Sequence, residues 1–201
     1  MSTVNIVADM IDKAPQGSFL SPGDLGIPSG AAAYMAWSRA ARSRTDLVRI
    51  ARGLYWKGAP TRFGLGRPNS IDVAIWRAGS RGVGPTGWLA SNHLGLSTQV
   101  PAEPRLTTVS RPPKAVAGVS YSQRANLDRI DLSYSEIALL EVLRSYPDYV
   151  EVTWTKLVDR VRQLQSDGVI NIRTCTRVAT SERSSTLRNT LHRLILDLSA
   201  Q

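Results

Sequence analysis

Basic side chains gather in one stretch of the chain. Between residues 39 and 67 there are eight arginines and lysines and one acidic residue, Asp46. Positive charge of this density is typical of proteins that contact the phosphates of nucleic acid. A solvated basic face without any partner gives the same pattern, so the composition alone leaves both interpretations open. The eight residues are Arg39, Arg42, Arg44, Arg49, Arg52, Lys57, Arg62 and Arg67.

Residues that carry enzyme chemistry are few and scattered. The two histidines, His93 and His192, lie far apart, and Cys175 is the single cysteine. One cysteine excludes an intramolecular disulfide and a cysteine-rich zinc site. No acid or nucleophile is spaced to act with His93, so we expect it to pack or to cap a helix. The sequence therefore predicts a protein that is not an enzyme and that needs no cofactor and no metal.

The glycine-rich segment 82–87 raises the question of nucleotide binding. It has no Gly-Lys-Ser/Thr ending, and no strand–loop–helix frame with an acid further along surrounds it. It therefore matches neither nucleotide-binding motif, and we expect a connecting turn.

Length and composition describe an ordinary globular protein. The chain has 201 residues, of which 42% are hydrophobic and 20% charged, with a formal net charge of +9. No run of apolar residues reaches the roughly 18 needed to cross a bilayer. The first residues carry acids and no basic leader, which predicts a cytoplasmic protein without a membrane partner. The positive surplus lies at the two ends: residues 1–70 hold nine basic and four acidic residues, whereas residues 71–155 hold eight of each.

The first 58 residues contain four predicted elements. Apolar residues at helical spacing predict a helix from about residue 4 to residue 14. A brief helix opened by Pro22 follows, and then an alanine-rich helix over 30–44 with Ser29 as its N-cap. Residues 47–58 form two β-prone runs around Gly53, whose tolerance of positive φ favours a tight hairpin. Three helices and a hairpin in this order are typical of a winged helix-turn-helix.

This pattern assigns roles to particular side chains. The third helix enters the major groove of DNA, and the hairpin tip lies on the backbone or in the minor groove. Such units also mediate protein contacts, which is the alternative. The residues that we expect at DNA are Ser29, Tyr34, Ser38, Arg39, Arg42, Arg44, Arg49, Arg52 and Lys57.

The rest of the chain predicts a second domain. Glycines and prolines in 59–68 indicate a linker, so the predicted domains are 1–58 and 69–201. Strands are expected over 105–110 and 116–121, with a third over 124–127. The last third is helical, and Ser133 and Glu136 have the spacing of a capping box. The fold class is therefore α+β: an N-terminal winged helix-turn-helix domain followed by a mixed α/β C-terminal domain that ends in helices.

Two segments resemble the AbiEi-type antitoxins. The first is Arg49-Ile-Ala-Arg-Gly-Leu-Tyr55, which is similar to the hairpin of that family. The second runs from Pro85-Thr-Gly to Asn92-His-Leu-Gly-Leu-Ser-Thr-Gln-Val-Pro101 and is similar to its central signature. The resemblance covers about residues 15–130, and the C-terminal helices have no counterpart that can be matched residue by residue.

The resemblance implies a function. Members are antitoxins of bacterial toxin–antitoxin and phage-defence modules, and their partner is a nucleotidyltransferase-like toxin. Their winged helix binds inverted repeats in the promoter DNA of the module, where two copies of the chain fit as a dimer, and represses its transcription. The alternative function is a stand-alone winged-helix transcriptional regulator whose C-terminal domain senses a ligand or dimerises.

Overall fold

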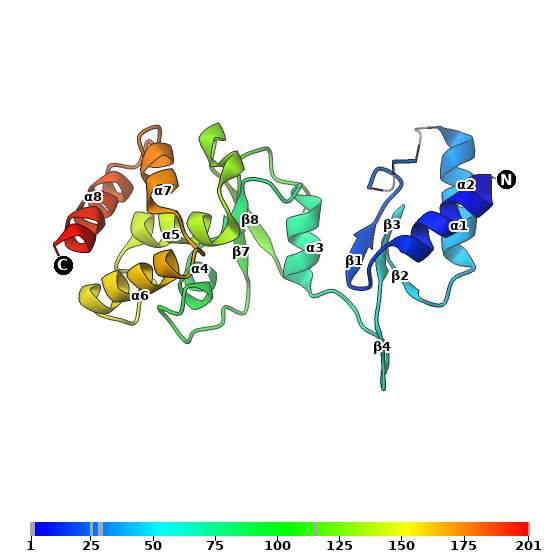
Figure 1. The fold of residues 1–201 in the computed structure, drawn as a ribbon, viewed down its shortest axis with the longest axis horizontal. Helices are drawn as coiled ribbons and strands as arrows, with labels where there is room; N and C mark the ends of the chain where they lie inside the picture. The colour runs from blue at the N-terminus through cyan, green and yellow to red at the C-terminus, as the bar shows by residue number, and fades with distance from the viewer. Residues whose placement is uncertain (1–2, 25, 28–29, 115, 201) are drawn as a thin grey trace. The chain divides into compact units, whose positions relative to one another are not determined.

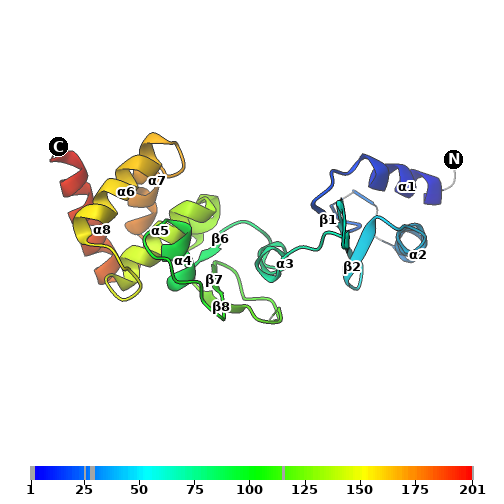
Figure 2. The ribbon, with the colours of Figure 1, turned by 90° about the horizontal axis from the view of Figure 1, so that it is seen from below.

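The chain folds into two compact units of mixed α and β structure, Met1–Asn69 and Ser70–Gln201. A computed structural model describes residues 3–24, 26–27, 30–114 and 116–200, and Figures 1 and 2 show it in two views. Each unit encloses a hydrophobic core of its own, so each is described by itself.

The first unit places two helices beside a small sheet. The helices are α1 (Thr3–Lys13) and α2 (Ala31–Arg42), and the strands are β1 (Ser18–Leu20), β2 (Leu47–Ala51) and β3 (Leu54–Lys57). The sheet is antiparallel in the order β1-β3-β2, so β2 is an edge strand. In Figure 1 the two helices lie side by side against the sheet.

Trp37 forms the centre of this core. Its side chain is completely buried between the two helices and the sheet, next to Val7 and Ile11 of α1. Its ring meets the ring of Tyr55 on β3 edge to face, with centroids 5.7 Å apart. A fully buried tryptophan contributes several kcal/mol of hydrophobic stabilisation, about 3 or more. It therefore fixes α2 against the sheet.

The prediction of a brief helix opened by Pro22 is wrong: the residues that the structure describes there form no helix. Ser21–Asp24 forms a turn in which the Asp24 carboxylate accepts hydrogen bonds from the Ser21 backbone and hydroxyl, at 2.9 and 2.6 Å. The side chain competes for backbone donors that a helix would need, which favours a turn. Ser29, the predicted N-cap of the next helix, lies outside the described residues; Gly30 is the N-cap, without a side-chain hydrogen bond.

The β2–β3 hairpin has the tight tip that Gly53 predicts. Arg52 and Gly53 form the turn, and Gly53 has a φ of 75°. The register shifts between Arg49 and Ala51, so Ile50 is an extra residue, a β-bulge. A bulge bends and twists its strand.

Residues 59–68, expected as a linker, contain a second hairpin. It consists of β4 (Pro60–Thr61) and β5 (Gly64–Leu65), closed by a 2.9 Å hydrogen bond from the Gly66 backbone N–H to Ala59 O. A β-carbon at position 58 would lie 2.5 Å from the Gly66 carbonyl oxygen. The glycines therefore allow two backbones to approach closely, and the first unit extends to Asn69.

The second unit begins with a sheet between helices. Its first helix is α3 (Ser70–Arg77), and its strands are β6 (Val83–Pro85), β7 (Arg105–Thr108) and β8 (Ser120–Gln123) in the order β6-β7-β8. β7 pairs antiparallel with β6 and parallel with β8. Figure 1 shows α3 on one side of this sheet and the helices α4 (Trp88–His93) and α5 (Tyr134–Ser145) on the other.

Helix α5 is the central element of the second unit. All residues from Glu136 to Leu143 are buried, because α4, β6, α7 (Ile172–Ala179) and α8 (Ser185–Ser199) pack around it. The predicted capping box is confirmed: Ser133 accepts from the Glu136 backbone, and Glu136 accepts from the Ser133 backbone. α6 (Trp154–Ser166) completes the bundle, and a short 3-10 helix, η1 (Leu127–Asp131), precedes α5.

Three predictions for this unit differ from the structure. The strand expected over 116–121 begins only at Ser120, and Val116 and Val119 form an isolated bridge before it. Residues 124–127 are not a strand but lead into η1, which Asn126 caps. Segment 82–87, expected only as a turn, includes the buried strand β6. Close packing explains why this segment has a glycine at position 84, because a β-carbon there would lie 2.4 Å from Ile137 on α5. The glycine lets strand and helix pack closely and has no role in holding a phosphate.

The second signature segment, 85–101, ties the sheet to the helices. The Thr86 hydroxyl donates to Glu141 of α5 at 3.1 Å, and Arg160 of α6 donates to the Leu94 carbonyl at 2.8 Å. The Glu151 carboxylate accepts hydrogen bonds from Ser97, Thr98 and Gln99. The contacts of this motif within the structure are therefore architectural.

Glu151 makes a testable contribution to stability. The Thr98 backbone N–H, with the side chains of Gln99 and Ser97, lowers the pKa of Glu151 to about 2. A lowered pKa in the folded state stabilises the protein above the ordinary pKa of 4.5 and ceases to do so as the pH falls toward 2. We expect Glu151→Gln to lower the urea midpoint at pH 7, and the gap to the parent protein to narrow below pH 4.5.

Urea titrations at several pH values measure this gap. Asp148→Asn serves as the control, because Asp148 is an exposed carboxylate in the same loop that accepts no hydrogen bond from segment 97–99. A gap of equal size at pH 7 and near pH 2 would show that the carboxylate charge of Glu151 is not what stabilises the segment.

Candidate nucleic-acid interface

Five of the nine side chains predicted to contact DNA line one hollow in the first unit. This arginine hollow has a volume of about 200 Å³ and lies between α2 and the β2–β3 hairpin. The predicted residues in it are Tyr34, Ser38, Arg42, Arg49 and Arg52.

Helix geometry explains the contribution of α2. Tyr34, Ser38 and Arg42 are four residues apart, so they lie on one face of the helix. The adjoining face carries Ala36, Trp37, Ala40 and Ala41, which are buried in the core, and Trp37 also borders the hollow. The alanines keep the helix close to the sheet, and the polar face turns toward the hairpin.

The hairpin brings two guanidinium groups to the same place. Arg49 pairs with Tyr55 in the register, so both lie on the helix-facing side of the sheet. Arg52 at the tip lies over the ring of Tyr34, with its Cζ 5.9 Å from the ring centroid. A β-carbon on Gly53 would lie 3.4 Å from the same ring. The tip and the helix are therefore in direct contact through Tyr34.

The electrostatics of the hollow are uniformly positive. Three arginines line it and no carboxylate does. Within the described residues, Arg42, Arg49 and Arg52 form no ion pair. Their N–H groups are therefore available to an anion, and a planar guanidinium matches two phosphate oxygens.

Arg39 lies beside the hollow and does not line it. It is exposed in the last turn of α2, and it also forms no ion pair among the described residues. Met35 also lines the hollow, and the residue is 59% exposed. Its position next to Tyr34 and four residues before Arg39 is the signal that places it on the outer face.

Lys57 does not reach the surface, which corrects its predicted role at DNA. Only 7% of the residue is exposed. Its Nζ donates to the carbonyl oxygens of Ile11, Asp12 and Ala14 at 2.8, 2.9 and 2.7 Å. These carbonyls belong to the last turn of α1 and the residue beyond it, where helical N–H donors run out; of the three, Ile11 O also accepts from the Ala14 backbone N–H at 3.3 Å. The ammonium group therefore caps α1 and joins it to β3.

Arg44 is also committed to the fold, contrary to its prediction as a DNA contact. Its Nε donates to Asp46 at 2.7 Å, and its Nη2 lies 2.7 Å from Asp12. Hydrogen bonds with Asp46 and then Asp12 raise the pKa of Arg44 above its usual range, and the same contact lowers the pKa of Asp46. Two carboxylates compensate this charge. Ser29 lies outside the described residues, so its predicted role is untested.

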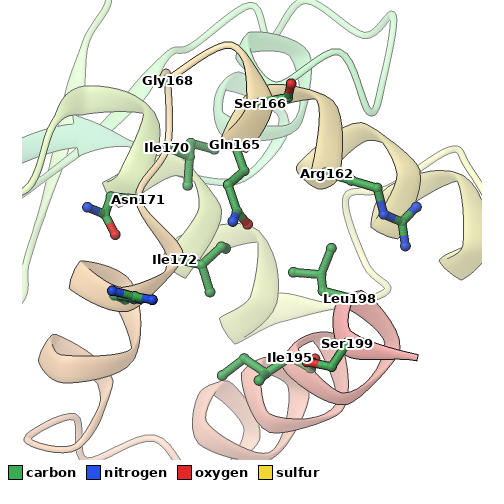
Figure 3. Close-up of a pocket in the computed structure, with 11 residues that line it drawn as sticks. Arg162, Gln165, Ser166, Gly168, Ile170, Asn171, Ile172, Ile195, Leu198 and Ser199 are labelled. Carbon is green, nitrogen blue, oxygen red and sulfur yellow. The ribbon is translucent and has the colours of Figure 1, made fainter. Parts of the chain in front are cut away.

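The second unit contains a larger hollow of a different character. It has a volume of about 920 Å³ and lies between α6, the start of α7 and α8. Figure 3 shows Ile172, Ile195 and Leu198 converging on it, with Gln165 from α6. Its apolar side chains are interleaved with polar ones, among them Gln165 and the arginines Arg162 and Arg173.

The chain belongs to a family of unknown function, DUF6088, whose model matches residues 6–114. That match includes both the arginine hollow and the signature segment. Among solved structures, the crystal structure of the RV2827C protein from Mycobacterium tuberculosis is similar, with 16% identity and a TM-score of 0.44 over 99% of this chain and 82% of that one. A comparison with curated proteins finds no match. The resemblance to AbiEi-type antitoxins is not tested by these comparisons and stays a prediction.

No helix among the described residues is both long and apolar enough to cross a membrane. They also contain no group of three or more histidine, cysteine or acidic side chains that could hold a metal ion.

Because Lys57 caps α1, its substitution should affect stability, whereas substitution of the exposed Arg49 on the same hairpin should not. We expect Lys57→Met to destabilise the first unit by about 2–3 kcal/mol, because three carbonyl groups at the end of α1, one of them buried, lose the ammonium donor. Arg49→Gln is the matched control, since Arg49 is exposed and unpaired, and it should change stability by no more than about 0.5 kcal/mol. Chemical denaturation followed by tryptophan fluorescence measures both. Equal stability of the two variants would contradict the assignment of Lys57.

Proposed function

We propose that the first unit binds double-stranded DNA as a winged-helix module. The observation that carries the proposal is the arginine hollow, where α2 and the hairpin tip present unpaired guanidinium groups side by side with no carboxylate between them. Phosphate contacts of this kind supply most of the affinity of such proteins and set their register on the duplex.

The order of elements supports this assignment. α1, β1, α2 and the β2–β3 hairpin follow one another, and the sheet order β1-β3-β2 places the hairpin beside the helices. The turn at Ser21–Asp24 stands where a three-helix unit has its second helix. A turn there shortens the motif and leaves α2 free to act as the recognition helix.

The proposed contacts follow from the geometry of the unit. α2 enters the major groove with the face that carries Tyr34, Ser38 and Arg42, and Arg39 flanks it. The hairpin tip with Arg52 lies on the adjacent backbone or in the minor groove, and Arg49 contacts phosphate at its edge. Tyr34 holds the tip against the helix, so the two elements bind as one surface.

The more specific proposal is an antitoxin that represses its own operon. It rests on the resemblance of segments 49–55 and 85–101 to AbiEi-type antitoxins. In this proposal the chain acts in the bacterial cytoplasm, binds inverted repeats in promoter DNA as a dimer, and counteracts a nucleotidyltransferase-like toxin as part of a phage-defence module. The second candidate is a stand-alone regulator, which is favoured by a hollow in the second unit that suits a small ligand.

DNA binding is tested first with arginine variants. We expect Arg42→Gln and Arg52→Gln each to weaken binding to the upstream DNA of the gene by about 1–3 kcal/mol where the side chain contacts a base. Where it contacts phosphate, the loss is similar for every sequence, and the slope of log K against log salt falls by about 1. Mobility shifts over a range of salt concentrations measure both.

Arg111→Gln is the matched control, because Arg111 is an exposed arginine in a loop of the second unit. It should bind like the parent protein. Unchanged binding by both Arg42→Gln and Arg52→Gln, or an equal loss in Arg111→Gln, would refute the arginine hollow as the interface.

The antitoxin proposal makes a separate prediction about the neighbouring gene. We expect that gene to arrest growth when expressed alone and that co-expression of this chain restores growth. A variant with both Arg42→Gln and Arg52→Gln should lose repression of a promoter reporter, because repression depends on DNA contact by the first unit. A neighbour that is harmless when expressed alone would favour the stand-alone regulator.

A further inference from the structure

A polar hollow in the second unit is the strongest feature that DNA binding does not use. It has a volume of about 560 Å³ and lies among the end of β8, the loop before η1, α5 and the loop between α7 and α8. We call it the ion-pair hollow. The side chains that line it and matter here are Arg124, Asn126, Arg144, Ser181, Glu182 and Arg183.

Two buried carboxylates hold the arginines of this hollow in place. Glu141 on α5 receives Arg124 Nη2 at 2.7 Å and Arg129 Nη1 at 2.7 Å. Glu182 receives Arg129 Nε at 2.5 Å and also accepts from Arg144 Nη2. The side chains of Glu141 and Arg129 are each only 1% exposed. The guanidinium groups are therefore positioned before any ligand arrives.

The cluster carries a surplus of positive charge. Arg124, Arg129 and Arg144 face two carboxylates, and Arg183 is exposed at the rim without an ion pair in the described part of the chain. Arg124 and Arg144 keep roughly a quarter of their side chains exposed, 26% and 23%. Their guanidinium groups therefore contribute positive potential inside the hollow and are not fully buried in the core.

Not all of the donors in the cluster are used. Arg129 Nη2 is buried and has no hydrogen-bond partner among the described residues, and Arg144 Nε makes no hydrogen bond but lies 3.4 Å from Glu141 Oε1 in an ion pair. Asn126 donates to Glu182 at 3.0 Å, so its amide fixes the carboxylate rather than occupying the hollow. A network that only stabilised the fold would gain by being closed over, because buried charges are costly unless fully paired.

From this geometry we infer that the ion-pair hollow binds the phosphate group of a small phosphorylated ligand. Preformed guanidinium forks match phosphate oxygens, and the volume suits a ligand of the size of a mononucleotide. Arg124, Arg144 and Arg183 hold the phosphate, whereas the Ser181 hydroxyl at the rim donates to the Asp128 carboxylate at 2.6 Å. Leu127, which also lines the hollow and is largely exposed, offers an apolar surface for the rest of the ligand.

The shape favours a small ligand over the backbone of a duplex. A duplex presents its phosphates along a line and is met by cations that project from a surface. Here two of the arginines are recessed and tied to carboxylates, and only Arg183 is exposed. The inference is independent of the proposed DNA interface, which lies in the other unit.

Calorimetric titration of the full chain with AMP tests the inference, with adenosine as the ligand that lacks phosphate. We expect AMP to bind with a dissociation constant of about 10 µM to 1 mM and adenosine not to bind. Arg183→Gln should weaken AMP binding about tenfold or more, because it removes a charge-assisted hydrogen bond. Inorganic phosphate in excess should displace AMP. Arg183 is exposed, so the variant should melt at the same temperature as the parent protein.

Two further variants locate the binding site. Arg173→Gln alters an exposed arginine on α7 that does not line this hollow, and it should bind AMP like the parent protein. Arg42→Gln with Arg52→Gln removes the arginine hollow of the first unit and should also leave AMP binding unchanged. Failure to bind AMP, or binding lost with Arg42 and Arg52 but kept in Arg183→Gln, would overturn the inference. A duplex whose binding requires Arg183 while AMP does not bind would also overturn it, in favour of a nucleic-acid surface.

Discussion

The ammonium group of Lys57 is the interaction on which the first unit depends. It holds three carbonyl groups at the end of α1 and thereby ties that helix to the last residue of β3. α2 packs on α1 through Trp37, and the hairpin continues from β3. Lys57 thus fixes α1 on the sheet, and Trp37 together with the contact of Arg52 and Tyr34 fixes α2 relative to the hairpin. The sequence predicts Lys57 as a phosphate contact, but in the structure its side chain stabilises the packing of α1 on β3.

The second unit also depends on a buried charged side chain. Helix α5 is buried along most of its length, yet it carries Glu141 in the middle of an otherwise apolar stretch. Burial of a carboxylate is unfavourable unless partners surround it. Arg124 and Arg129 together with Thr86 supply them. The sheet, the loop before η1 and the helical bundle are thus held to one side chain, which also shapes the ion-pair hollow.

Local signals predicted those parts of the fold that depend on neighbouring residues. The capping box at Ser133 and the hairpin tip at Gly53 depend on spacing and backbone freedom, and both are found in the structure. Contacts between residues that are distant in the sequence leave no local pattern. Lys57 is an example, because it caps a helix whose carbonyl groups lie 43 to 46 residues before it. Helix α7 begins at the Asn171 cap and buries Cys175. The candidate site was largely predictable, because exposed arginines on a hairpin and on one helix face follow from periodicity.

The edge position of β2 has a consequence beyond recognition. An unpaired strand edge offers its backbone to any other strand, and self-association through such edges leads to aggregation. Here the edge strand is short, bears Arg49 and is deformed by the bulge at Ile50. Like charges would face each other if two copies approached strand to strand, and the twist would prevent a regular ladder. The charge of Arg49 and the bulge at Ile50 therefore make pairing of β2 with the same strand of a second copy unfavourable.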